Sequence, residues 1–187
     1  MKTPADTELV ISLQNGDISS GGILYERYKR NIYYFVVKMV KSDEAAQDIV
    51  QDVFIRMIEK IGSLQNADIV KQWLFAIARN ESLMFLRRKN LVLMEGLEAS
   101  MECIIDGETP DTKFRQQETR QLVHDAISVL APPYREIILL QLTGQLSYEE
   151  IAEITQSTVS AVRSKLHKAR IALAKQLSPM IRKEMKS

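Results

Sequence analysis

Cysteine and histidine are scarce in this chain of 187 residues, which holds one cysteine, Cys103, and two histidines, His124 and His167. A disulfide framework needs paired cysteines, and an ordinary zinc site needs several cysteine or histidine ligands held together. The sequence therefore excludes a disulfide-stapled fold and an ordinary zinc site, so we expect no bound metal. The same composition fits a reducing compartment.

Long apolar runs are also missing. No stretch approaches the roughly 20 apolar residues that a membrane-spanning helix needs. The opening MKTPADTELV lacks the apolar core of a signal peptide. Both absences predict a cytoplasmic protein without stable membrane insertion. Hydrophobic residues still make up 45% of the chain, which is enough for a packed globular core.

Motifs of known catalytic sites do not occur in the sequence. It contains no P-loop, no G-x-S-x-G, no H-E-x-x-H and no neighbouring cysteine–histidine pair. We therefore expect no catalytic residues, no cofactor and no enzymatic activity. The net charge is also uninformative, because 25 basic residues balance 24 acidic ones. Any binding of nucleic acid must come from local segregation of charge.

Only five prolines and seven glycines interrupt the chain, and nearly every extended segment has helical periodicity. This pattern predicts an all-α protein. The predicted helices of the N-terminal part span residues 7–14, 23–41, 43–61 and 69–89. A second helical block runs from about residue 114 to 186, in which Pro132 and Pro133 start a helix at about Tyr134.

An acidic segment separates the two helical blocks. Residues 91–111 hold six acidic side chains and no lysine or arginine, and glycine and proline interrupt them. We therefore predict two small helical domains, residues 1–90 and 114–187, joined by an acidic linker over residues 91–113.

A helix-turn-helix pattern stands in the second block. Ser147 and Glu150 fit a capping box, which fixes a helix start directly after Ser147. Residues 155–157 (TQS) are poor helix formers that make the turn, and Thr158 caps the next helix. Such turns often contain glycine, which is absent here. A non-glycine residue with positive φ costs on the order of 1 kcal/mol, which weakens a small domain but does not forbid the turn.

The helix after this turn has two unlike faces. Its apolar face, expected to pack inward, carries Val159, Val162, Leu166, Ala169 and Leu173. Its polar face carries Ser160, Arg163, Ser164, His167 and Lys168, with Lys165 and Arg170 beside it. Cations meet phosphates, and arginine and serine reach base edges, so this face favours duplex DNA. A solvated basic helix in a bundle is the alternative.

One isoleucine lies in the middle of a polar helix face in the first block. The side chains around Ile55 on this face are Asp48, Gln51, Asp52, Arg56 and Glu59. Polar groups that surround one exposed aliphatic residue are typical of a partner-binding surface. The alternative is a single exposed isoleucine, which is common on protein surfaces.

The predicted helix over residues 69–89 carries the only tryptophan and ends in three basic residues. One stripe of this helix holds Trp73, Ile77, Asn80 and Met84, with Arg87 at its edge. Aromatic rings together with cations are typical of surfaces that bind single-stranded nucleic acid. Core packing is the alternative for Trp73, Phe75 and Phe85, and we expect it to hold for at least one of them.

Both blocks resemble one family. AAQDIVQDVFIRMIEKI followed by KQWLFAIARNESLMFLRRK resembles region 2 of the sigma-70 family, in its extracytoplasmic-function (ECF) group. LAPPYREIILLQLTGQLSYEEIAEITQSTVSAVRSKLHKARIAL resembles region 4 of the same group. The resemblance covers nearly the whole chain outside the linker. It implies a sigma factor that binds core RNA polymerase and directs initiation at promoters with -10 and -35 elements.

The resemblance also implies partners and site residues. The partners are the clamp helices of the largest polymerase subunit, the flap of the second-largest subunit, promoter DNA and an anti-sigma factor. The implied polymerase contacts are Asp48, Gln51, Asp52, Ile55 and Arg56. The implied contacts to the non-template -10 strand, with its flipped bases, are Ser63, Leu64, Gln65, Asn66, Trp73, Phe75, Asn80, Arg87 and Arg88. The implied contacts to the -35 duplex are Thr158, Ser160, Arg163, Ser164, Lys165, His167 and Lys168.

The chain departs from the family pattern at a few positions. Two glycines, Gly21 and Gly22, stand where a helix former and an aromatic residue are usual, Met84 replaces a common aspartate, and Gln156 replaces the turn glycine. Two rival functions remain open. A free-standing helix-turn-helix regulator leaves the exposed isoleucine and the tryptophan stripe unexplained. An RNA-binding or antitermination protein would use the basic helices without a double-stranded site.

Overall fold

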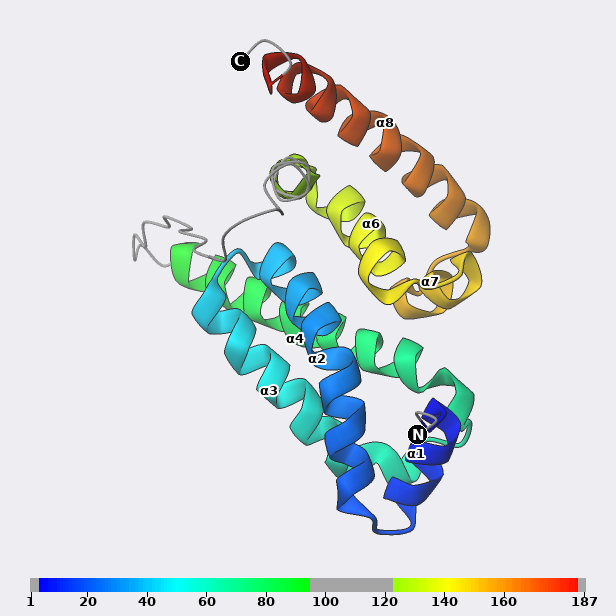
Figure 1. The fold of residues 1–187 in the computed structure, drawn as a ribbon. Coiled ribbons are helices and arrows are strands. Elements are labelled where there is room, and N and C mark those ends of the chain that lie inside the picture. The colour runs from blue at the N-terminus through cyan, green and yellow to red at the C-terminus, as the bar shows by residue number, and fades with distance from the viewer. Residues whose placement is uncertain (1–3, 95–122, 185–187) are drawn as a thin grey trace. The chain divides into compact units, whose positions relative to one another are not determined.

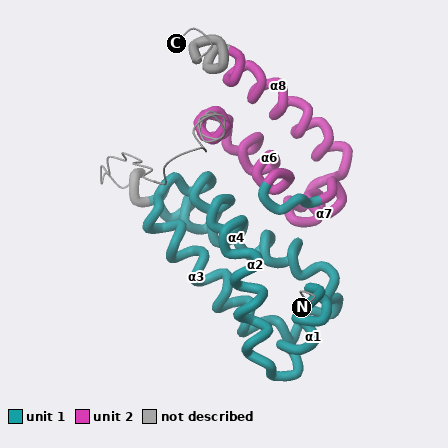
Figure 2. Tube along the Cα trace, viewed as in Figure 1, with its two compact units in different colours: residues 1–103, 143–146 teal, residues 104–142, 147–187 magenta. Residues whose placement is uncertain are grey.

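The computed structural model describes residues 4–94 and 123–184, and every regular element in these ranges is a helix (Figure 1). The predicted all-α fold class is confirmed. The chain divides into two compact units (Figure 2). The first unit comprises residues 1–103 with 143–146, and the second comprises residues 104–142 with 147–187.

The first unit is a bundle of four helices. They are α1 (Asp6–Gln14), α2 (Ile18–Val40), α3 (Asp43–Lys60) and α4 (Val70–Met94), with the short 3₁₀ helices η1 (Ile61–Ser63) and η2 (Ala67–Ile69) between α3 and α4. Helices α2, α3 and α4 pack against one another, and α1 packs against α2. The largest fully buried side chains of this unit are Leu24, Ile32, Phe35, Met57, Leu74 and Phe75. Each contributes about 1.5–3 kcal/mol by leaving water.

Helix α2 begins at Ile18, five residues before the predicted start at residue 23. Asp17 caps it, because its carboxylate accepts a hydrogen bond from the Ser19 amide at 3.1 Å. The helix then runs through two glycines that sequence propensity disfavours by about 1 kcal/mol each. Gly21 is buried, and a Cβ on it would lie 2.8 Å from Ile58 Cδ1 of α3. Close packing of α2 on α3 therefore outweighs the local preference that shortened the prediction.

Helix α4 reaches Met94, five residues past its predicted end and into the predicted linker. No glycine or proline stands between Asn90 and Met94, so nothing in the sequence ends the helix there. The rest of the predicted linker, and the start of the helical block predicted at residue 114, lie outside the described residues.

The second unit contains the predicted helix-turn-helix. Its helices are α6 (Pro132–Gly144), which ends beyond the boundary of the unit, α7 (Tyr148–Thr155) and α8 (Val159–Glu184), and residues 123–128 are also helical. Helix α6 begins at Pro132, two residues before the predicted Tyr134, because both prolines fit in a first turn. The Arg135 guanidinium donates to the carbonyls of Ser128 and Leu130 at 2.8 Å each. These bonds tie the preceding helix to α6, and burial lowers the pKa of Arg135.

Candidate functional site

The polar face of α3 has the composition predicted from the sequence. Asp48, Gln51 and Asp52 are exposed, and Ile55 among them is 46% exposed. Serine at the N-cap starts the helix, since Ser42 Oγ accepts a hydrogen bond from the Ala45 amide. Burial of Val53, Phe54 and Met57 against the bundle then fixes which face stays in water.

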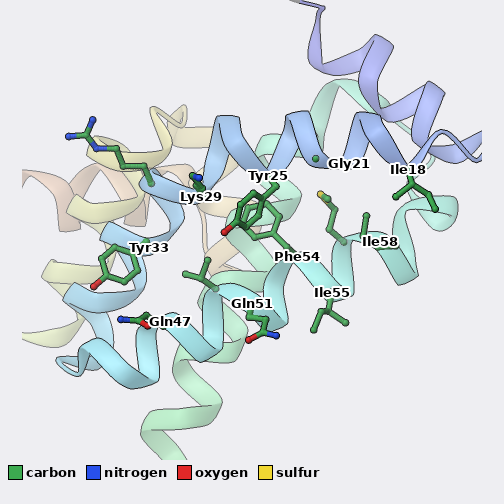
Figure 3. A pocket seen from close by; sticks show the side chains of 14 residues that line it. Ile18, Gly21, Tyr25, Lys29, Tyr33, Gln47, Gln51, Phe54, Ile55 and Ile58 are labelled. Carbon is green, nitrogen blue, oxygen red and sulfur yellow. The ribbon is translucent and has the colours of Figure 1, made fainter.

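Ile55 lines an open groove of about 1000 Å³ between α2 and α3. Figure 3 shows the side chains that line it. Ile18, Tyr25 and Ile58 are exposed apolar side chains beside Ile55, and Ile18 is 75% exposed. The Tyr25 and Phe54 rings meet edge to face with centroids 4.8 Å apart. The site is therefore a continuous apolar surface and not one isolated isoleucine.

Sequence reasoning missed most of this groove. Ile58 was not among the residues predicted on the polar face, yet it is 45% exposed. Ile18 lies before the predicted start of its helix, so its place on a helix face could not be judged. The available signal was Tyr25, because it is an aromatic residue on the polar side of its helix. Lys29 follows four residues later, and its ammonium lies 5.1 Å from the centroid of the Tyr25 ring.

Arg56 is less available for a partner than the other residues predicted on this face. Its Nε lies 3.1 Å from Oε1 of Glu81 on α4, and the Glu81 side chain is only 9% exposed. A buried carboxylate without a counter-charge is strongly unfavourable, so this pair ties α3 to α4. Met84, one of the departures from the family pattern, lies in a hollow of about 330 Å³ beside the same pair, together with Asp48, Asp52 and Arg88.

The loop between α3 and α4 orders most of its own polar side chains. Ser63 Oγ donates to the Lys60 carbonyl at 2.7 Å, and Asn66 Oδ1 accepts from the Asp68 amide at 3.0 Å. Gln65 is exposed and makes no side-chain hydrogen bond to the described part of the chain. Leu64 is 8% exposed. Leu64 therefore packs within the loop, and its contact with the -10 strand stays a prediction.

Helix α4 presents part of the predicted stripe to solvent. Trp73, Ile77 and Met84 are half-buried, and Asn80 and Arg87 are exposed. Phe75 differs, because it is fully buried and its ring meets the Phe35 ring edge to face at 5.7 Å. Core packing therefore applies to Phe75, whose ring has no free face for a base. Arg88 remains exposed, with Nη2 3.7 Å from Met84 Sδ.

The turn between α7 and α8 has the geometry inferred from its residues. Ser147 Oγ accepts from the Glu150 amide at 3.1 Å, and Glu150 returns a bond to the Ser147 amide at 2.6 Å. Gln156 takes the left-handed conformation with φ of 52°. Thr158 Oγ1 accepts from the Ala161 amide at 3.1 Å, which caps α8. Gln156 therefore stands where such turns often have glycine, and its backbone conformation is strained for a residue that carries a side chain.

Helix α8 separates its two faces as predicted. Val162, Leu166 and Ala169 are buried, and Val159 and Leu173 are half-buried. The residues of the polar face that lie exposed are Thr158, Ser160, Arg163, Ser164, His167 and Lys168, while Lys165 is half-buried. Six exposed polar side chains over three turns give a surface that can reach phosphates and base edges together.

Tyr148 of α7 contacts the basic face of α8, a contact that sequence reasoning missed. The Arg163 guanidinium lies 5.9 Å from the centre of the Tyr148 ring, within reach of a cation–π interaction. Arg170 Nη2 donates to Gln141 Oε1 at 3.0 Å and lies 3.4 Å from the Tyr148 hydroxyl. The tyrosine therefore orders two cations of this face.

Within residues 4–94 and 123–184, no group of three or more histidine, cysteine or carboxylate side chains comes together as a metal site. Among the helices of the same ranges, none is long and apolar enough to cross a bilayer.

Family models match both units. Residues 24–91 match Sigma-70 region 2, and residues 120–173 match Sigma-70 region 4. The RNA polymerase sigma-H factor of Pseudomonas aeruginosa is 30% identical over 95% of this chain and 96% of its own length. The ECF RNA polymerase sigma-E factor of Escherichia coli K12 is 31% identical over 95% of this chain and 97% of its own length. SigW of Bacillus subtilis is 30% identical over 88% of this chain and 92% of its own length.

Solved structures share the fold. CnrH in complex with the cytosolic domain of CnrY aligns with a TM-score of 0.67 and 21% identity, over 94% of this chain and 99% of CnrH. RpoE of Bartonella quintana, solved with the anti-sigma factor NepR, aligns with a TM-score of 0.69 and 23% identity, over 83% of this chain and 95% of RpoE. Regions 2 and 4 occur here in the family's order, and the relatives match along nearly their whole length. The chain therefore belongs to the ECF group of the sigma-70 family and is an RNA polymerase sigma factor for promoter-specific transcription initiation.

Proposed function

We propose that this sigma factor holds core RNA polymerase through the exposed face of α3 and the adjoining α2–α3 groove. The observation that carries the proposal is the exposed Ile55 at the edge of an apolar groove, with Asp48, Gln51 and Asp52 around it. A desolvated apolar centre with a polar rim is the usual anatomy of a protein interface. The clamp helices of the largest polymerase subunit are the proposed partner of this surface.

The substitution Ile55→Asp tests this surface. A carboxylate in a buried interface centre leaves an unpaired charge, so we expect affinity for core polymerase to fall at least about tenfold, which corresponds to about 1.4 kcal/mol. Because Ile55 is exposed, we expect the thermal midpoint of the free protein to stay unchanged. The measurement is a titration of labelled protein with purified core polymerase.

Ile11→Asp is the matched control, since Ile11 is 50% exposed on α1 and lies outside the groove. We expect it to bind core like the wild type. Equal core affinity of the Ile55 and Ile11 variants would refute the α3 surface.

The -10 strand is proposed to lie over the loop after α3 and the exposed stripe of α4. Support comes from Trp73 and Asn80 on one stripe and from the exposed guanidiniums of Arg87 and Arg88. Aromatic side chains stack with unpaired bases, and cations follow the backbone. In the loop, Gln65 is the proposed reader of a flipped base, because both the donor and the acceptor of its amide are free to pair with a base edge.

The -35 element is proposed to receive α8 in its major groove. Arg163 and Lys168 are exposed on the same face as serine and threonine hydroxyls, a mixture that suits base edges and phosphates. The proposed division into domains follows: residues 1–90 act on the -10 element, residues 91–113 connect, and residues 114–187 act on the -35 element. Helix α4 itself continues to Met94, so the first residues of this connecting segment are helical.

The remaining partners are the flap of the second-largest polymerase subunit and an anti-sigma factor. The anti-sigma proposal is supported by RpoE of Bartonella quintana, which has the same fold and was solved with its anti-sigma factor NepR. We propose that the protein acts in the cytoplasm, where polymerase is, and has no enzymatic activity of its own. Formation of a complex that blocks core binding is the expected result when such a partner is co-expressed.

A further inference from the structure

Helix α1 makes two hydrogen bonds to the loop between α3 and α4 through a single side chain. Gln14 Nε2 donates to the carbonyl of Ile61 at 2.9 Å and to the carbonyl of Leu64 at 2.9 Å. Both amide hydrogens of Gln14 are therefore used. The first carbonyl belongs to the first residue of the short 3₁₀ helix η1 and the second to the residue that follows η1, so Gln14 bonds to both ends of this turn.

The two hydrogen bonds from Gln14 reinforce a short turn that is otherwise closed by the bond from the Leu64 amide to the Ile61 carbonyl. A 3₁₀ turn has poor hydrogen-bond geometry and is stable only in short pieces. Gly62 in its middle is exposed, and a Cβ on it would meet nothing within 4 Å. Ile61 and Leu64 anchor the turn by burial. The Ile61 carbonyl also accepts a hydrogen bond from the Leu64 amide at 3.0 Å, whereas the Leu64 carbonyl is paired here through Gln14. Loss of Gln14 therefore loosens the loop at Leu64, directly before Gln65.

A second bond from α1 holds the far end of the same loop. Thr7 Oγ1 donates to Asp68 Oδ1 of η2 at 2.8 Å. The amide of Asp68 in turn donates to Asn66 Oδ1, so this bond stabilises the turn that presents Gln65 and Asn66. Helix α1 thus touches the loop at both ends, before and after its exposed residues.

Helix α1 is itself firmly attached to the bundle. Its Leu9, Val10 and Leu13 are buried. At its N-terminus, Asp6 accepts bonds from the Arg27 guanidinium and the Tyr28 hydroxyl of α2. The loop is therefore bonded to a helix that is itself held against the bundle.

We propose that Gln14 and Thr7 are positioning residues for promoter recognition, which hold the loop in the conformation that lets Gln65 read a base of the -10 strand. This inference rests on the proposed role of the loop in strand capture. Preorganised groups bind more tightly because less conformational entropy is lost on binding. We call the hydrogen bonds from Gln14 and Thr7 to the loop the brace. Loss of the brace lowers the affinity for the strand, and it also lowers the preference for one base at the position that Gln65 reads.

The test compares Gln14→Met and Thr7→Val with the wild type in holoenzyme assembled from full-length chains and purified core polymerase. Methionine keeps the length of glutamine without its donors, and valine keeps the shape of threonine without its hydroxyl. The control is Gln176→Met, the same exchange at an exposed position of α8. The probe is a set of fluorescent single-stranded oligonucleotides, selected from a random library by wild-type holoenzyme and then varied one base at a time.

We expect Gln14→Met to weaken oligonucleotide binding about tenfold, as the loss of two hydrogen bonds implies. It should also flatten the base preference at one position. Thr7→Val is expected to show a smaller loss of the same kind, and Gln176→Met none. The thermal midpoint of the Gln14 variant should fall by roughly a few degrees, as the loss of hydrogen bonds implies. Core affinity should change little in all three variants, and this unchanged core affinity separates positioning from general destabilisation.

Three outcomes decide between the proposals. Weaker and less selective strand binding at unchanged core affinity supports the brace. Wild-type strand binding and selectivity in both the Gln14 and Thr7 variants would overturn it while leaving the loop's role intact. Failure of wild-type holoenzyme to select any strand, or equal selectivity of Gln65→Ala, would instead overturn the proposed role of the loop and the brace with it.

Discussion

At the scale of single residues, three non-glycine positions among the described residues hold positive φ: Lys41, Gln145 and Gln156. Gln156 ends α7 and sets the direction in which α8 leaves the turn. The left-handed conformation costs an L-residue roughly 1–2 kcal/mol, and glycine avoids this cost. The strain is therefore a local and removable weakness of the second unit.

We expect Gln156→Gly to raise the free energy of unfolding of the second unit by about 0.5–1 kcal/mol. The gain is smaller than the strain itself, because glycine also makes the unfolded chain more flexible. Urea unfolding followed by circular dichroism measures it, while the fluorescence of Trp73, the only tryptophan, follows the first unit separately. A loss of stability would show that the glutamine side chain contributes something that the structure does not explain.

Arg163 is the residue whose role on α8 can be stated most sharply. It is exposed, and its guanidinium lies over the Tyr148 ring, which limits the directions it can take. We expect Arg163→Ala to cost about 1–3 kcal/mol of binding at matched -35 duplexes and to relax the preference at one base pair. Holoenzyme binding to a panel of singly substituted duplexes measures this effect.

Lys175→Ala provides the control, since Lys175 is exposed on α8 two turns beyond the basic face. We expect no change in base preference from that variant. An equal loss on every duplex for Arg163→Ala would make this arginine a phosphate contact and contradict base reading.

At the scale of helices, the two adjacent glycines of α2 have different environments. A Cβ on Gly22 would meet nothing within 4 Å, whereas one on Gly21 would lie 2.8 Å from Ile58 Cδ1. We expect Gly22→Ala to stabilise the first unit by about 0.5–1 kcal/mol, because alanine is the better helix former. Gly21→Ala should gain less, since the Ile58 side chain has to move. Urea unfolding followed by Trp73 fluorescence compares them, and an equal or larger gain for Gly21→Ala would contradict the packing described.

Local chemistry made several elements predictable. The capping box of Ser147 and Glu150, the cap at Thr158 and the spacing of Val162, Leu166 and Ala169 all act within one or two turns, so the sequence alone predicts them. The start of α2 was predicted too late because close packing on Ile58 outweighs glycine's low propensity. The end of α4 was predicted too early, although nothing in the sequence stops the helix before Met94.

Contacts between distant residues were beyond sequence reasoning. Gln14 binds carbonyls that lie 47 and 50 residues away along the chain, and no local pattern marks it. Phe75 and Trp73 are aromatic neighbours on one helix, yet Phe75 is buried against Phe35 of α2 and Trp73 is only half-buried. Arg56 likewise faces a buried Glu81 that sits on another helix. For these residues the tertiary fold, and not the residue type, decides the role.

At the scale of the whole molecule, a net charge of +1 conceals an uneven distribution of acidic and basic residues along the chain. Residues 91–111 carry six acidic side chains and no basic ones, whereas residues 160–187 carry one acidic side chain and eight basic ones. Electrostatic attraction to DNA is therefore concentrated in the second unit, the proposed reader of the -35 element. The apolar groove on the first unit is proposed to join that unit to polymerase, so that two DNA-binding surfaces act together only in the holoenzyme.

Run-off transcription with purified core polymerase on a library of promoter fragments tests this account most directly. We predict that core with this chain initiates at a defined subset of fragments that share two spaced elements, and that core alone does not. We also predict that Ile55→Asp abolishes this initiation at protein concentrations where the wild type is saturating. Failure to direct any initiation, together with tight sequence-specific binding of duplex DNA by the chain alone, would contradict the account and favour a free-standing regulator.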